Sequence, residues 1–104
     1  RIRGCMLQPQ PDHLQLHALI EGRVQGVGFR YFVLQNAMQL GLTGWVRNTW
    51  DDKVEVCAQG SRPDLEKLAG LLRTGPGSAH VTAVKADWQP ASGCFSSFKV
   101  LSDS

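Results

Sequence analysis

The chain has 104 residues, of which 42% are hydrophobic and 19% are charged, a composition typical of one globular domain and not of a disordered segment. Its formal net charge is +2, and two of the eleven basic residues are Arg1 and Arg3. The remainder carries nine basic and nine acidic residues, so we expect no general electrostatic attraction to nucleic acid, and any anion must be bound at a local site.

No apolar run approaches the roughly 20 residues that span a bilayer, and the residues after Met6 lack the apolar stretch of a signal peptide. The three cysteines, Cys5, Cys57 and Cys94, form no Cys-x-x-Cys pair. This spacing argues against a disulfide framework and against a zinc site. Scattered reduced thiols are typical of a cytoplasmic protein, and we expect that location.

In chain order, the sequence begins with a segment, residues 1–12, that has no hydrophobic period. We expect it to be a disordered N-terminal arm, or in part a cloning remnant, and we expect residues 13–104 to form a single domain. From Leu14 to Ile20 apolar and polar residues alternate, as in a strand with one buried face. The segment 22–28 contains three glycines and predicts a loop.

Apolar residues then recur at helical spacing from Phe29 to Leu40, and Gly41 is suited to end a helix in the left-handed conformation. The same periodicities predict the remaining elements, which are strands over residues 43–48 and 53–59, a helix that follows Ser61 and ends near Gly75, and strands over residues 81–88 and 97–101. Two helices cannot cover both faces of a four-stranded sheet. We therefore predict an α+β fold, a two-layer sandwich of ferredoxin-like type (βαββαβ), with two helices on one face of a mainly antiparallel sheet of four to five strands.

The glycine-rich loop has the features of an anion-binding site. Glycines let successive backbone N–H groups turn toward one point, and the start of the helix adds unpaired N–H groups and a partial positive charge. Arg30 lies in the first turn of the predicted helix, where a cation opposes the helix dipole by up to about 1 kcal/mol. A phosphate held between the loop amides and the planar guanidinium would offset this cost. Alone, the loop is a weak signal, because it matches neither the dinucleotide-binding nor the Walker pattern.

Two strings in this region resemble a known family. The segment 22–30, Gly-Arg-Val-Gln-Gly-Val-Gly-Phe-Arg, resembles the signature of the acylphosphatase family, and so does the segment 41–49, Gly-Leu-Thr-Gly-Trp-Val-Arg-Asn-Thr. The resemblance extends from about Leu14 to Leu101. It implies a metal-independent hydrolase without a cofactor, which cleaves the carboxyl–phosphate bond of acyl phosphates to give carboxylate and phosphate.

The resemblance also implies the roles of individual residues. Arg30 and Asn48 are the implied catalytic residues, of which Arg30 binds the substrate phosphate and Asn48 orients the attacking water. The implied phosphate-binding loop consists of Gly22, Arg23, Val24, Gln25, Gly26, Val27 and Gly28. Both catalytic roles suit this chemistry, because an acyl phosphate has a good leaving group and phosphoryl transfer then needs mainly charge stabilisation and in-line positioning. A neutral amide can hold a water by donating and accepting hydrogen bonds.

The hairpin after Asn48 departs from the family pattern. The family often has Pro followed by Asp-Gly where this chain has Trp50-Asp51-Asp52. Asp52 is therefore expected to adopt a positive φ, which Asp tolerates better than most residues do. This departure concerns local stability or substrate approach and leaves Arg30 and Asn48 in place.

Two other functions stay open. RNA-recognition domains share the predicted element order, but their aromatic signature lies on the third strand, and residues 53–59 contain no aromatic residue. The second alternative is an acylphosphatase-like domain of a larger hydrogenase-maturation carbamoyltransferase, in which the same loop handles carbamoyl phosphate. We expect a monomer whose partner is a small-molecule acyl phosphate, with no nucleic acid and no membrane.

Overall fold

A computed structural model describes residues 13–91 and 95–101 of the chain. The predicted N-terminal arm at residues 1–12 lies outside this part. The elements are β1 (His13–Arg23), α2 (Phe29–Gln39), β2 (Thr43–Asn48), β3 (Val54–Ser61), α3 (Arg62–Thr74), β4 (His80–Pro90) and β5 (Phe98–Val100). Every predicted element is present, and β2 has the predicted bounds.

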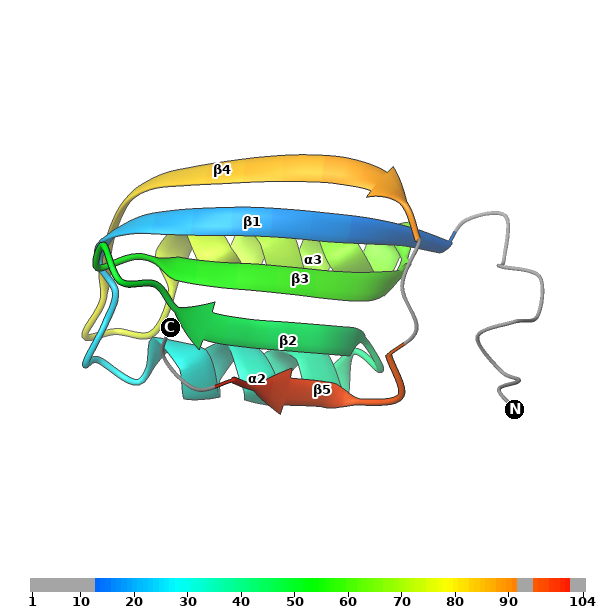
Figure 1. Cartoon of the computed structure of the whole chain (residues 1–104), viewed down its shortest axis with the longest axis horizontal. Coiled ribbons are helices and arrows are strands. Elements are labelled where there is room, and N and C mark those ends of the chain that lie inside the picture. Colours follow the sequence, from blue (N-terminus) through cyan, green and yellow to red (C-terminus); the bar gives the residue numbers. More distant parts are fainter. Residues whose placement is uncertain (1–12, 92–94, 102–104) are drawn as a thin grey trace.

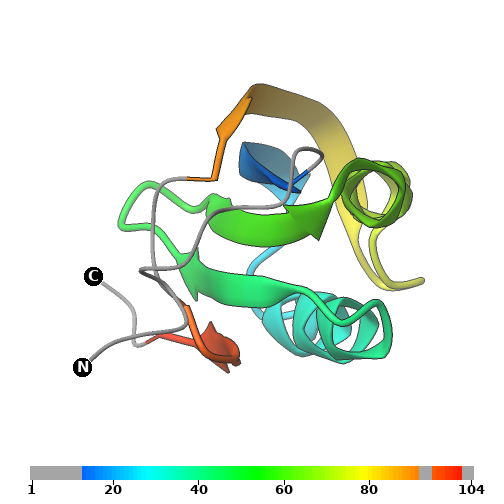
Figure 2. The same cartoon turned by 90° about the vertical axis from the view of Figure 1, so that its right-hand side faces the viewer.

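The five strands form one mixed sheet in the order β4-β1-β3-β2-β5. β1 pairs antiparallel with β3 and β4, β2 pairs antiparallel with β3, and β5 pairs parallel with β2. Both helices lie on the same side of the sheet (Figures 1 and 2). The predicted fold, a ferredoxin-like sandwich with two helices on one face, is confirmed.

The core lies between the helices and the sheet. Alternate residues of β1 and β3 point into it, as their period-two pattern predicts. The helices contribute residues at spacings of three and four, so that each presents one apolar stripe to the sheet. The fully buried side chains of 0–1% exposure are Leu16, Ala18, Ile20, Val24, Phe29, Val33, Ala37, Val46, Val54, Val56, Ala58, Leu65, Leu68 and Leu72.

The strand directions determine which chain segments meet at one edge of the sheet. β1 and β2 are both antiparallel to β3, so they run in the same direction, and β5 runs parallel to β2. The C-terminal ends of β1, β2 and β5 therefore lie at the same edge, which is on the left in Figure 1. This edge therefore carries the loop 24–28, which follows β1, together with Asn48 at the end of β2 and Val100 at the end of β5.

Two conformations that the sequence predicts at turns are present. Gly41, just after α2, has a φ of 71°. Asp52, in the hairpin between β2 and β3, has a φ of 70°. It is the only non-glycine residue with a positive φ in the described part of the chain. Three strands are longer than predicted. β1 covers His13–Arg23, so the prediction of a loop is wrong for Gly22 and Arg23, whose backbone pairs with Val81 and His80 of β4. β3 extends to Ser61, and β4 covers His80–Pro90, where it pairs with nearly the whole of β1.

Candidate active site

The loop between β1 and α2 turns its backbone toward the edge of the sheet described above. Gly26 has a φ of 74° and Gly28 a φ of 80°, both in the left-handed region that other residues adopt only with strain. Gly28 is also the N-cap residue of α2, and no side chain caps this helix start. The first N–H groups of α2 have no acceptor within the helix, so they and the loop amides can bind an anion.

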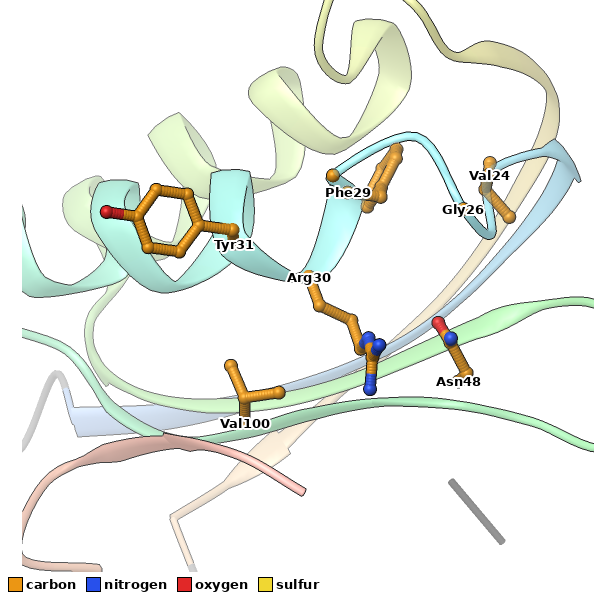
Figure 3. A pocket seen from close by; sticks show the side chains of 8 residues that line it. Val24, Gly26, Phe29, Arg30, Tyr31, Asn48 and Val100 are labelled. Carbon is orange, nitrogen blue, oxygen red and sulfur yellow. The ribbon is translucent and has the colours of Figure 1, made fainter. Parts of the chain in front are cut away.

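A cavity of about 270 Å³ opens beside this loop (Figure 3). Such a volume lies just under the usual range for ligand pockets and fits a small substrate. It is bounded by the loop, by the first turn of α2 and by the ends of β2 and β5. The lining residues are Val24, Gly26, Gly28, Phe29, Arg30, Tyr31, Asn48 and Val100.

Asn48 is the last residue of β2, and its backbone pairs with Val54 of β3. The residue is 6% exposed, and its side chain lines the cavity. Within residues 13–91 and 95–101, its carboxamide makes no side-chain hydrogen bond. A buried polar group without a partner costs about 1–3 kcal/mol, and such groups in native proteins call for a reason beyond stability. A carboxamide directed into a cavity can both donate to and accept from a bound water.

Arg30 approaches the cavity from the opposite wall. It lies in the first turn of α2, which contains no acidic residue, and it is half-buried. Figure 3 shows its guanidinium directed toward the strand that carries Asn48. Arg30, the start of α2 and two glycines of the loop therefore line one space, an arrangement that suits an anion.

The sequence relatives of the chain agree with this geometry. The sequence model of the family described as Acylphosphatase matches residues 16–100, a range that includes every residue lining the cavity. The chain belongs to the acylphosphatase family. A protein named Acylphosphatase from Mycobacterium sp. (strain KMS) is 47% identical over 85 residues, which are 82% of this chain and 89% of that protein.

The fold of the chain is also similar to solved structures of acylphosphatases. An acylphosphatase from Coxiella burnetii has a TM-score of 0.84 and 35% sequence identity, over 90% of this chain and 98% of that chain. The structure of T. kodakarensis HypF contains a region with a TM-score of 0.75 and 30% identity, which covers 86% of this chain and 12% of that chain.

A glutamine in the acylphosphatase loop links the two halves of the site. Nε2 of Gln25 donates to the carbonyl oxygens of Thr49 and Lys53, both at 2.8 Å. Thr49 follows Asn48 directly, and its N–H donates to the Lys53 carbonyl at 2.9 Å. The loop is thus joined to the turn of the hairpin that directly follows Asn48. We call these two hydrogen bonds of Gln25 the loop–hairpin brace.

The cavity is lined by a part of the predicted loop and by further residues. Val24, Gly26 and Gly28 line it, and Arg30 and Asn48 do so as well, whereas the predicted loop members Gly22, Arg23, Gln25 and Val27 do not. Gly22 instead lies at an irregularity in the pairing of β1 with β4, and the Val27 carbonyl accepts a hydrogen bond from Ser78.

Sequence reasoning missed three lining residues, which are Phe29, Tyr31 and Val100. Phe29 and Tyr31 flank Arg30, so the position of Arg30 in the first helical turn could have indicated them. Nothing near Val100 in the sequence indicates that β5 pairs with β2, since parallel pairing joins segments that are far apart in the chain.

A second polar cluster lies on the open face of the sheet, away from the helices. Oε2 of Glu55 is 2.6 Å from Nε2 of His17, and Oε1 of Glu55 is 2.7 Å from Nη2 of Arg47. Burial raises the pKa of Glu55, but the hydrogen bonds from His17 and Arg47 outweigh it and hold the pKa below its ordinary value. Cys57, the next residue on this face of β3, is 6% exposed, and burial raises the pKa of its thiol.

No group of three or more His, Cys, Asp or Glu side chains in the described residues is arranged to hold a metal ion. Across the same part of the chain, neither helix has the length and apolar character needed to cross a membrane.

Proposed function

We propose that this chain hydrolyses small acyl phosphates, that Arg30 and the amides of the loop bind the phosphate, and that Asn48 orients the attacking water. The observation that carries these roles is the shared cavity. A half-buried guanidinium lines the same space as two glycines of positive φ and a buried carboxamide, which has no side-chain hydrogen bond within the part of the chain that the structure describes. The family signature at residues 22–30 supports the same roles.

The reaction places modest demands on the protein. The water oxygen forms a bond to phosphorus while the bond from phosphorus to the acyl oxygen breaks, and the carboxylate leaves with the electron pair. The proton of the water ends on a phosphate oxygen or in solvent. Because a carboxylate is a good leaving group, no acid is needed to protonate it, and rate acceleration comes from charge stabilisation and from in-line positioning.

Each group in the cavity meets one of these demands. The guanidinium of Arg30 and the N–H groups of the loop and of the helix start bind the phosphoryl oxygens, whose charge is spread in the transition state. The carboxamide of Asn48 can accept a hydrogen bond from water and donate one to a phosphoryl oxygen, which fixes the direction of attack. Since Arg30 supplies the positive charge, we further propose that the reaction needs no added metal ion.

The direct test is the hydrolysis of acetyl phosphate by the wild type and by Arg30→Ala and Asn48→Ala, in the presence of a chelator. We expect each variant to lose about 100-fold or more in kcat, the usual effect of removing a group that stabilises the transition state. Arg73→Ala, an exposed arginine in the last turn of α3, is the matched control and should keep wild-type turnover. A wild type without activity would refute the function, and an active Arg30→Ala or Asn48→Ala would refute that residue's role.

Asn48→Ala has a second readout. Because the carboxamide makes no side-chain hydrogen bond in the described structure, its removal breaks none, and the free energy of unfolding should not fall as it does for most buried polar groups. A variant that is inactive yet as stable as the wild type would place the effect in the reaction. A large loss of stability would instead indicate a structural role.

The second candidate is the alternative from the sequence, an acylphosphatase-like domain that handles carbamoyl phosphate within a larger protein. The similarity to a part of T. kodakarensis HypF keeps this alternative open. The identity of 30% to T. kodakarensis HypF is lower than the 47% to the protein from Mycobacterium sp. (strain KMS), so we favour acylphosphatase activity. Comparing kcat/KM for carbamoyl phosphate and acetyl phosphate distinguishes the two, because a carbamoyl-specific site would prefer the former. We also propose that the protein is a cytoplasmic monomer, which size-exclusion chromatography and cell fractionation would test.

A further inference from the structure

The cavity has two chemically different ends. The polar groups of Arg30 and Asn48 lie toward the end of the cavity where Val24, Gly26 and Phe29 also line it, whereas Tyr31 and Val100 line the other end (Figure 3). Tyr31 is 62% exposed and Val100 is 40% exposed, and they are the two exposed large hydrophobic residues that line the cavity. In Figure 3 the guanidinium of Arg30 lies between them and Asn48. Apolar side chains that stay exposed beside a polar site are typical of a surface that contacts a ligand.

In-line geometry determines where the acyl group of the substrate lies. In phosphoryl transfer, the attacking and leaving oxygens stand on opposite sides of phosphorus. If Asn48 holds the water, the leaving carboxylate points away from Asn48. With the phosphate held at Arg30, that direction leads to the end of the cavity that Tyr31 and Val100 line (Figure 3).

We propose that Tyr31 and Val100 form an acyl-binding surface and that this surface selects apolar or aromatic acyl groups. This inference rests on the proposed function and adds the substrate class. The ring of Tyr31 offers an aromatic face for an aryl group, and the branched side chain of Val100 offers a second apolar contact. No residue lining the described cavity is acidic, so a cationic acyl group would find no counter-charge there.

The exposure of both residues makes the test feasible. Tyr31 lies on the outer side of α2 and contributes little to the core, so its substitution by Ala should leave the fold intact. Val100→Thr keeps the branched shape in β5 and replaces a methyl group by a hydroxyl. Met38 provides the matched control, because it lies on the same helix with an exposure of 63% and does not line the cavity.

The experiment measures kcat/KM for benzoyl phosphate and for acetyl phosphate with each variant. Tyr31→Ala should lower the ratio of benzoyl to acetyl phosphate by about threefold to tenfold, the size of an aromatic pair interaction. Val100→Thr should lower it by about threefold through the loss of one apolar contact. Met38→Ala should leave the ratio unchanged. Inhibition by inorganic phosphate, which has no acyl group, should be the same in all four proteins.

The outcomes separate this inference from the proposed function. A wild type that hydrolyses acetyl phosphate, together with an unchanged ratio in Tyr31→Ala, would refute the acyl-binding surface alone. Equal losses for both substrates in Tyr31→Ala would also refute it, since they would indicate a general effect on the site. A wild type that hydrolyses neither substrate would refute the proposed function, and the acyl-binding surface with it.

Discussion

The loop–hairpin brace makes a sharp prediction about how this site is held together. Gln25→Ala removes both hydrogen bonds, each 2.8 Å long, that join the phosphate loop to the carbonyl oxygens of Thr49 and Lys53. The side chain does not line the cavity, so the substitution leaves the groups proposed to contact substrate unchanged. Any effect on the reaction must therefore come from a change in the relative position of the two halves of the site.

The structure sets the expected loss of stability. Two intramolecular hydrogen bonds contribute about 1–3 kcal/mol together. The Lys53 carbonyl keeps its hydrogen bond from the Thr49 N–H at 2.9 Å. Losing the bond from Gln25 therefore costs less free energy at Lys53 than at Thr49. We therefore expect the free energy of unfolding to fall by about 1–2 kcal/mol. Gln25→Glu should cost at least as much, because it directs a carboxylate oxygen at two carbonyl oxygens.

The kinetic effect should fall on kcat. The loop amides and Arg30 belong to the same short segment, residues 22–30, so they should still bind phosphate in the variant. Asn48 belongs to β2, on the other side of the loop–hairpin brace, so its position relative to the phosphate would change. A displacement of about 1 Å between water and phosphate can lower the rate about 100-fold. We expect kcat to fall about 10- to 100-fold with little change in the inhibition constant of inorganic phosphate.

Urea denaturation and steady-state hydrolysis of acetyl phosphate measure both effects. Gln35→Ala is the matched control, since Gln35 is exposed on α2. The reasoning would be refuted by a Gln25→Ala variant with wild-type kcat. It would also be refuted if phosphate binding weakened as much as kcat fell, because the loop itself would then have been disordered.

Three further predictions concern single positions. Glu55→Gln should lower the free energy of unfolding by about 1–2 kcal/mol at neutral pH, through weaker bonds to His17 and Arg47. Because the folded state holds the pKa of Glu55 below its ordinary value, this contribution is full above that value and is lost as the pH falls through the folded-state pKa, so the two proteins should converge in acid denaturation. Asp52→Gly should raise the melting temperature, since φ at this position is 70°, with turnover unchanged. Gly28→Ala should cost about 1–2 kcal/mol, because φ is 80°, and should reduce kcat by displacing the helix-start amides.

Each of these has an outcome that contradicts it. A constant difference between wild type and Glu55→Gln at all pH values would show that the charge of Glu55 contributes nothing. A lower melting temperature for Asp52→Gly would mean that the side chain stabilises the turn more than its backbone strain costs. Wild-type turnover in Gly28→Ala would show that the amides at the start of α2 do not contribute to phosphate binding.

Much of the molecule could be predicted from short stretches of sequence. The alternation from Leu14 to Ile20 places one face of β1 in the core, and the apolar spacing after Phe29 gives the buried stripe of α2. The positive φ of Asp52 also follows from its place in a tight hairpin. These features depend on a residue and its near neighbours, because periodicity and backbone sterics act over a few residues.

The composition of the cavity could not be predicted in this way. The family signature indicated Arg30 and Asn48, but β5 brings Val100 to the site through a parallel pairing with β2, and Tyr31 joins it from the first turn of α2. The same holds for the brace from Gln25, whose acceptors lie in the hairpin after β2.

The sequence by itself determined the strands, the helices and the glycine loop with its arginine, since each arises from local periodicity, capping and backbone freedom. Only the tertiary structure decided that the ends of β1, β2 and β5 share one edge, and that a buried carboxamide faces a guanidinium there. The physical reason is that strand order and direction are settled by the burial of whole faces against the helices, to which residues from all parts of the chain contribute.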